Sequence, residues 1–173
     1  MFVHGVCIAR RRLVTRLVRS TGPQPRVADR DAITLLHHLL NIYLVEDSPV
    51  IRESLVATLE ELVPVQVVGA AEDEATAVRW LADTAHAVDL VIVDIFLKGG
   101  TGLGVLRAAQ ALPPPRYRLV VLSNYATPYM RRECLALGAD RVFDKSNEID
   151  SLIEYCGRMA AGDCPESNPL ALA

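Results

Sequence analysis

Short apolar runs alternate with stretches of helical periodicity along most of the chain, and this alternation limits the fold more than any other feature. The predicted strands are residues 39–45, 65–70, 89–94, 118–122 and 141–144. The predicted helices are 49–62, 73–85, a helix that ends near 112, 128–137 and 148–161. Strands that alternate with helices indicate parallel pairing, right-handed crossovers and helices on both faces. The pattern therefore predicts an α/β domain with a doubly wound, five-stranded parallel sheet over residues 39–161.

Local signals place several of the helix ends. Ser48 before Pro49 is typical of an N-cap followed by proline in the first helical position. The run of prolines at 113–115 ends the third helix, and Gly138 suits the position just after the fourth. The near-continuous apolar runs of the first, third and fourth strands indicate a sheet that is buried on both faces.

Charge divides the sequence unevenly. Residues 1–40 contain seven Arg and two Asp, whereas the whole chain has a formal net charge of −3, so the folded part is acidic. An acidic domain argues against a DNA-binding stripe. We interpret residues 1–38 as a basic, disordered or dispensable extension and 162–173 as a short tail, with a targeting segment or nucleic-acid contact as the alternative for the former. No apolar run reaches the roughly 18–20 residues of a membrane span.

The four cysteines show no C-x-x-C spacing, so the sequence predicts neither a zinc knuckle nor a dithiol motif. Idle or buried thiols in a reducing compartment fit this spacing, and we expect a cytoplasmic location.

Removal of residues 1–38 is expected to leave both the fold and the chemistry of the domain intact, because the segment precedes the first strand and differs from it in charge balance. Thermal melting of the truncated chain tests this. A loss of stability above about 2 kcal/mol, as large as a core deletion, would show that the segment is packed.

Polar residues stand at the carboxyl ends of four predicted strands. Glu46 and Asp47 follow the first strand, Asp94 ends the third, Ser123 ends the fourth and Lys145 follows the fifth. The carboxyl ends of parallel strands share one edge of a sheet, where ligands bind near a topological switch point. The second strand brings no such residue unless Glu72 reaches in.

This set of side chains suits phosphoryl transfer. Three converging carboxylates repel one another unless a cation intervenes, and Mg²⁺ suits such a site because it accepts carboxylates, water and phosphate oxygens. A lysine can neutralise a carboxylate and then hold a phosphoryl oxygen, and a serine hydroxyl can donate to the same group. A carboxylate nucleophile that forms an aspartyl phosphate is a known covalent strategy.

Each residue also has an ordinary structural interpretation. Glu46 and Asp47 could begin a helix, where acids favour the positive end of the dipole. Asp94 could cap a loop, Ser123 could belong to a turn and Lys145 could be a solvated charge. Together these interpretations require four independent coincidences at one sheet edge.

The chain resembles a response-regulator receiver domain of the CheY-like type over residues 39–161, which implies a flavodoxin-like (βα)5 fold and a role in two-component phosphorelay signalling. The resemblance is carried by Leu-Val-Glu-Asp-Ser at 44–48, Asp-Leu-Val-Ile-Val-Asp-Ile at 89–95 with Gly102 beyond, Leu-Ser-Asn at 122–124, and Gly-Ala-Asp-Arg-Val-Phe-Asp-Lys at 138–145.

The resemblance implies a metal site. Asp47 would bind Mg²⁺ directly, Glu46 would act largely through water, and Asp94 and the backbone carbonyl of Phe96 would supply further ligands.

It also implies the roles in the reaction. Asp94 would be the phosphoacceptor, and Ser123 and Lys145 would hold the phosphoryl oxygens. The donor would be a phosphohistidine on a sensor histidine kinase or a phosphotransfer protein. The chain would not be an enzyme beyond its own phosphorylation and autodephosphorylation.

Three positions depart from the family pattern. Lys98 and Ser146 stand where the family often has proline, four residues after the acceptor and directly after the active-site lysine. The switch aromatic of the fifth strand falls at Val142, with Phe143 next to it.

The leading interpretation is a stand-alone receiver with protein partners and no DNA-binding domain, since only residues 162–173 follow the last predicted helix. The downstream partner is unknown. A haloacid-dehalogenase-type phosphatase is one alternative, although Phe96 stands where that class needs an acid. A receiver-like interaction module that is never phosphorylated is the other.

Overall fold

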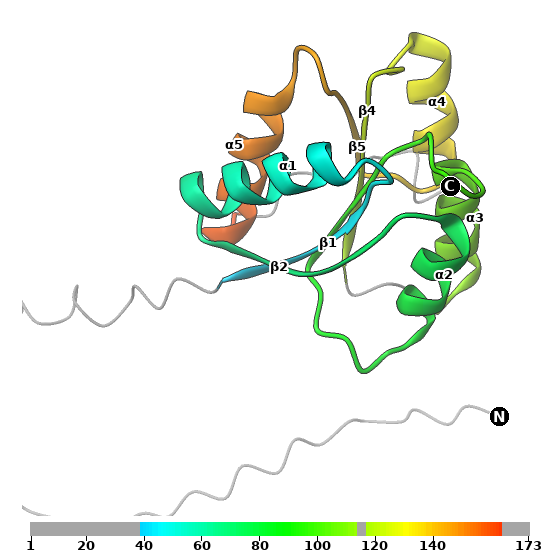
Figure 1. Ribbon diagram of the computed structural model, residues 1–173, viewed down its shortest axis with the longest axis horizontal. Coiled ribbons are helices and arrows are strands. Elements are labelled where there is room, and N and C mark those ends of the chain that lie inside the picture. Colours follow the sequence, from blue (N-terminus) through cyan, green and yellow to red (C-terminus); the bar gives the residue numbers. More distant parts are fainter. Residues whose placement is uncertain (1–38, 114–116, 164–173) are drawn as a thin grey trace, which may run out of the picture. The chain divides into compact units, whose positions relative to one another are not determined.

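The computed structural model describes residues 39–113 and 117–163 (Figure 1). The expected extension at 1–38 and most of the expected tail lie outside the described residues. The strands are β1 (Leu40–Val45), β2 (Val65–Ala71), β3 (Leu90–Val93), β4 (Arg118–Ser123) and β5 (Arg141–Asp144). The helices are α1 (Pro49–Leu62), α2 (Glu74–Ala82), α3 (Gly102–Ala111), α4 (Pro128–Ala136) and α5 (Ile149–Ala160).

All five strands pair in parallel, in the order β2-β1-β3-β4-β5. Helices α2, α3 and α4 pack with one face of the sheet and α1 and α5 with the other, and each face has its own apolar cluster (Figure 1). The doubly wound, flavodoxin-like sheet predicted from the sequence is therefore confirmed.

The order of the strands positions the site. The chain moves outward from β1 to β2, then crosses to β3 on the other side of β1 and continues to β4 and β5. The topological switch point thus lies between β1 and β3, and ligands of such sheets bind at the carboxyl ends of those strands.

Two predicted helix ends are confirmed. The hydroxyl oxygen of Ser48 accepts a hydrogen bond from the amide of Ile51 at 3.4 Å, with Pro49 in the first turn of α1. Gly138 follows α4 with a φ of 90°, a conformation that glycine adopts without strain.

Helix α2 ends at Ala82, three residues before the predicted end at 85. The carboxylate of Asp83 accepts a hydrogen bond from the amide of Ala85 at 2.9 Å, and the carbonyl of Asp83 accepts one from the amide of His86. Such local bonds compete with the helix and favour a turn.

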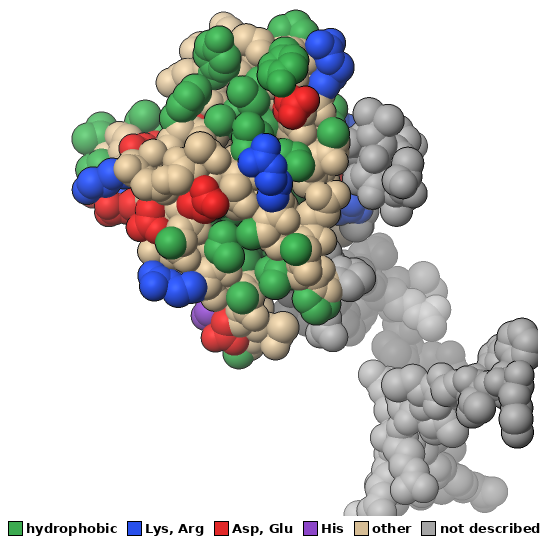
Figure 2. Space-filling view, turned by 90° about the vertical axis from the view of Figure 1, so that its right-hand side faces the viewer, with side chains coloured by type: hydrophobic (Ala, Val, Ile, Leu, Met, Phe, Trp, Pro, Cys, Tyr) green, Lys and Arg blue, Asp and Glu red, His purple; other side chains and the backbone are tan. Residues whose placement is uncertain are grey.

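The surface on the α3 and α4 side carries mixed chemistry. In Figure 2, the coloured Lys and Arg side chains lie scattered among acidic and hydrophobic ones rather than in one basic patch. Among the described helices, none has the length and apolar character that crossing a membrane requires. The described cysteines, Cys134 and Cys156, are both buried and free.

Gly157→Ala is expected to raise the free energy of unfolding by about 0.5–1 kcal/mol, because alanine loses less backbone entropy than glycine in a helix. Gly157 lies within α5, and an added Cβ would meet Val63 Cγ1 at 3.4 Å, an ordinary van der Waals contact. Urea unfolding of the two proteins measures the difference. A lower stability of the variant would show that α5 cannot accept the methyl group.

Candidate functional site

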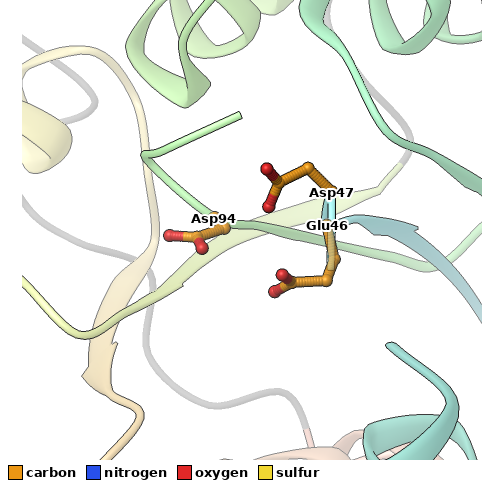
Figure 3. A group of neighbouring side chains, drawn as sticks. All are labelled: Glu46, Asp47 and Asp94. Carbon is orange, nitrogen blue, oxygen red and sulfur yellow. The ribbon is translucent and has the colours of Figure 1, made fainter. Parts of the chain in front are cut away.

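Three acidic side chains meet at the switch point (Figure 3). Glu46 and Asp47 follow β1 and Asp94 follows β3, and one carboxylate oxygen from each lies within 4.8 Å of the others. Glu46 is only 4% exposed and Asp94 only 8%, whereas Asp47 is half-buried. The structure thus brings together acids that are far apart in the sequence.

The sheet fixes the backbone from which these acids project. The amide of Asp94 donates to the carbonyl of Val45 at 2.8 Å, and the amide of Glu46 donates to the carbonyl of Ala71 at 2.9 Å. Each bond continues the ladder one residue past the strand. The acids therefore stand on rigid supports, which a site for positioned chemistry needs.

Arg52 was not identified from the sequence, yet it supports the acid pair. Its Nη1 donates to the backbone carbonyl of Glu46 at 2.8 Å, and its Nη2 lies 3.5 Å from the carboxylate of Glu72. Glu72 is thus paired with Arg52 and does not belong to the acidic cluster. A basic residue one turn into the helix after an acid pair is the signal that could have identified Arg52.

Lys145 reaches the cluster from the loop after β5. Its Nζ lies 2.5 Å from Glu46 Oε2 and 2.6 Å from Asp94 Oδ2. Burial lowers the pKa of Lys145, but the hydrogen bonds and charges of Asp94 and Glu46 outweigh this effect and raise the pKa above its usual value. The lysine is therefore held as a cation beside the Asp94 carboxylate.

Ser123 lies at the end of β4, fully buried. Its hydroxyl oxygen accepts from the amide of Tyr125 at 3.4 Å, and its carbonyl accepts from the amide of Lys145 at 3.2 Å. The second bond joins the strand end that carries the serine to the loop that carries the lysine.

The segment after Asp94 is held close to the start of α3. The amide of Phe96 points to Asp94 Oδ1 at 3.4 Å, and the amide of Gly102 donates to the carbonyl of Ile95 at 2.8 Å. A Cβ on Gly102 would lie 2.1 Å from the carbonyl oxygen of Asp94, a distance that backbone atoms cannot accept. Glycine is therefore required here for the approach of α3 to Asp94.

Val142, at the position of the family's switch aromatic, and its neighbour Phe143 lie on opposite faces of the sheet. Val142 packs in the cluster beneath α2, α3 and α4, whereas Phe143 packs in the cluster of α1 and α5, edge-to-face with Tyr155 at 5.8 Å. Phe143 therefore does not replace an aromatic side chain at Val142.

The formal charges favour a divalent cation. Three carboxylates and one ammonium leave a formal charge of −2 at the cluster. Oxygen ligands that keep room for water and phosphate are what Mg²⁺ prefers. The donor set thus fits this ion.

The sequence matches the response regulator receiver domain family over residues 42–156, more than half of the chain. The chain belongs to this family. Members generally bind Mg²⁺, and the acidic cluster of this receiver could hold such an ion. Because the matching family is the receiver domain, the sequence match does not support the haloacid-dehalogenase alternative.

Two curated proteins illustrate the relationship. The Fimbriae Z protein of Salmonella typhimurium is 25% identical over 122 residues, which cover 70% of this chain and 57% of that protein. The response regulator UvrY of Escherichia coli is 35% identical over 69 residues, which cover 40% of this chain and 31% of UvrY. The match thus spans about half of one relative and a third of the other.

Solved structures share the fold. A two-component response regulator of the LuxR family from Aurantimonas superimposes with a TM-score of 0.64 at 24% identity, over 78% of this chain and 94% of that one. The signal receiver domain of NarL from Mycobacterium tuberculosis superimposes with a TM-score of 0.61 at 25% identity, over 72% of this chain and 98% of that one.

The prediction of partners without a DNA-binding domain is wrong. The similar structures include a DNA-binding response regulator of the LuxR family from Staphylococcus aureus, with a TM-score of 0.58 at 19% identity over 67% of this chain and 94% of that one. The prediction rested on the short stretch after the last helix. The residues that follow a receiver domain say little about output, because the matched region spans only part of each curated relative.

Proposed function

We propose that this receiver accepts a phosphoryl group from a phosphohistidine donor on Asp94, in a Mg²⁺-dependent reaction, and signals through a surface that depends on phosphorylation. The observation that carries the proposal is the buried carboxylate of Asp94 at the switch point, with Glu46 and Asp47 beside it and Lys145 bonded to it. The similar proteins include LuxR-family response regulators. We therefore propose that the phosphorylation-dependent surface of this receiver regulates the activity of a LuxR-family regulator.

In this proposal Asp47, Glu46, Asp94 and the backbone carbonyl of Phe96 would hold the ion, and Glu46 would act largely through water. Mg²⁺, when bound, supplies positive charge against the carboxylates and the phosphoryl oxygens. The chain's own residues do the rest of the positioning.

The transfer itself is a displacement at phosphorus. A carboxylate oxygen of Asp94 forms a bond to phosphorus while the phosphorus–nitrogen bond of the donor breaks, and the imidazole leaves with the electron pair and takes up a proton. Lys145, now bonded to Asp94, would hold a phosphoryl oxygen, and the hydroxyl of Ser123 would donate to another. Catalysis of this kind comes mainly from position and charge.

The test is phosphate uptake from a small-molecule phosphodonor. We expect one acid-labile phosphate per chain with Mg²⁺ and none when a chelator removes the ion, because the acids would then repel the incoming group. Each chain is labelled once and turns over only by autodephosphorylation, which separates this protein from a phosphatase. Absence of uptake at saturating Mg²⁺ would instead favour the unphosphorylated interaction module.

A further inference from the structure

One guanidinium group connects three elements beside the phosphorylation site. Arg131, on α4, donates from Nε to the carbonyl of Ala126 at 3.0 Å and from Nη1 to the carbonyl of Val142 at 2.5 Å. Its Nη2 donates to Glu148 Oε2 at 2.6 Å. The β4–α4 loop, β5 and the start of α5 are thus all tied to a single side chain.

Glu148 completes the connection on the side of β5. The oxygen that accepts from Arg131 also accepts from the amide of Asp144 at 2.6 Å, and the amide of Glu148 donates back to the carbonyl of Asp144 at 2.8 Å. The hydrogen bonds from Arg131 and Asp144 lower the pKa of Glu148 below its usual value. The two ends of the loop, Asp144 and Glu148, are therefore hydrogen-bonded to each other, and Lys145 lies between them in the sequence.

The β4–α4 loop and the β5–α5 loop, which Arg131 connects, adjoin or contain two residues of the proposed reaction. Ala126 lies three residues beyond Ser123, and Lys145 follows Asp144 directly. We propose that Arg131 and Glu148 form a clamp that positions Ser123 and Lys145 for phosphoryl transfer. This inference rests on the proposed function of Asp94, and the two clamp residues are positioning residues that touch neither donor nor phosphate.

The clamp explains how this loop keeps its shape without the proline that often follows the active-site lysine. Ser146 occupies that position, and a serine has no ring to fix φ as proline does. A guanidinium can serve three acceptors in different directions because its donors are arranged in a rigid fork, whereas a lysine offers one compact ammonium. Both the shape and the charge of Arg131 are thus required.

The structure contains a matched control at the opposite end of β4 and β5. Arg118 Nη1 donates to Asp140 Oδ1 at 2.8 Å, and Asp140 Oδ2 accepts from the amide of Leu119 at 2.9 Å. This pair has the same composition of guanidinium, carboxylate and backbone amide, and Asp140 is the less exposed of the two carboxylates. Because it lies at the far end of both strands from Ser123 and Lys145, it separates positioning from general stability.

The experiment compares the full chain with Arg131→Ala, Arg131→Lys, Glu148→Ala, the double alanine variant and Asp140→Ala. Phosphorylation by a small-molecule phosphodonor at saturating Mg²⁺ gives a maximal rate and a half-saturating donor concentration. We expect about a tenfold lower maximal rate in the first four variants, since small misplacements of reacting groups are costly. The half-saturating concentration and Mg²⁺ affinity should stay within about twofold, because clamp residues contact neither ligand.

Three comparisons decide the proposal. Asp140→Ala should keep the maximal rate within about twofold even where its melting temperature falls as far as that of Glu148→Ala. The double variant should be no slower than either single one, because residues that act as a unit are not additive. Arg131→Lys, which keeps the charge, should remain slow. Equal slowing by Asp140→Ala, or full activity of the lysine variant, would overturn the clamp.

Hydrogen exchange without any phosphodonor measures the clamp on its own. The amides of residues 144–148 should exchange faster in Arg131→Ala and Glu148→Ala than in the unaltered chain. Their exchange rates should stay unchanged in Asp140→Ala. If the unaltered chain takes up no phosphate, the proposed function fails while the exchange data still report the clamp. Unchanged exchange in both clamp variants overturns the inference alone.

Discussion

Asp94→Asn is expected to abolish phosphate uptake, because an amide oxygen is a poor nucleophile and an amide cannot form the aspartyl phosphate. The substitution keeps the shape of the side chain, so the fold and the ladder bond from Asp94 to Val45 should remain. Intact-mass spectrometry after treatment with a small-molecule phosphodonor and Mg²⁺ measures the uptake, and peptide mapping locates it in the unaltered chain.

Asp89→Asn is the matched control. Asp89 stands just before the other end of β3, and its carboxylate accepts from the amide of Asn41 at 2.8 Å, a bond that the amide oxygen of asparagine can retain. This variant should take up phosphate as the unaltered chain does. Undiminished labelling of Asp94→Asn would place the acceptor elsewhere and remove the basis of the proposed function.

The sequence predicted the elements of the fold well because their signals are local. Runs of apolar residues mark strands that are buried on both sides, and Pro49 and Gly138 mark helix boundaries. The order of strands and helices then leaves few topologies. Glu46, Asp47 and Asp94 gather at one edge because the strands that carry them are parallel, so the sequence was enough to predict that juxtaposition.

Contacts between side chains from distant elements could not be predicted in the same way. The sequence predicted that Lys145 lies at the same sheet edge as Glu46, but it did not predict the bond from Arg131 to Glu148, which depends on how α4 lies against the start of α5. Neither Arg131 nor Glu148 has a periodic or spacing signal that indicates this contact. The early end of α2 has a local cause instead, because the Asp83 carboxylate accepts from an amide two residues on and this turn competes with the helix.

The wrong prediction about DNA-binding output has a different cause. Acidic charge and a short C-terminal stretch are properties of the receiver and of this sequence, whereas the curated relatives extend beyond the matched region. A receiver needs no basic surface of its own when another part of a regulator contacts DNA.

Two exposed aromatic residues follow Asp94 and Ser123 closely in the sequence. Phe96 lies two residues beyond Asp94 and Tyr125 two residues beyond Ser123, and their ring centroids are 5.9 Å apart at an interplanar angle of 77°. They are 58% and 53% exposed, so the pair lies at the surface rather than in the core. We infer that the bulk of the rings limits the entry of water in line with the phosphorus, and neither ring carries an acid or amide that would orient that water.

Phe96→Asn combined with Tyr125→Glu is therefore expected to speed autodephosphorylation about tenfold or more, which corresponds to a barrier lower by about 1.4 kcal/mol. Mg²⁺ affinity should change little, because the ligand proposed for Phe96 is its backbone carbonyl. The measurement is phosphate release after the donor is removed, at saturating Mg²⁺. Tyr129→Glu is the control, since Tyr129 is an exposed aromatic on α4 at 62% exposure and the substitution adds the same charge. Equal release rates in the double variant and the unaltered chain would refute the shielding while leaving Asp94 as acceptor, and equal acceleration by Tyr129→Glu would assign the effect to surface charge.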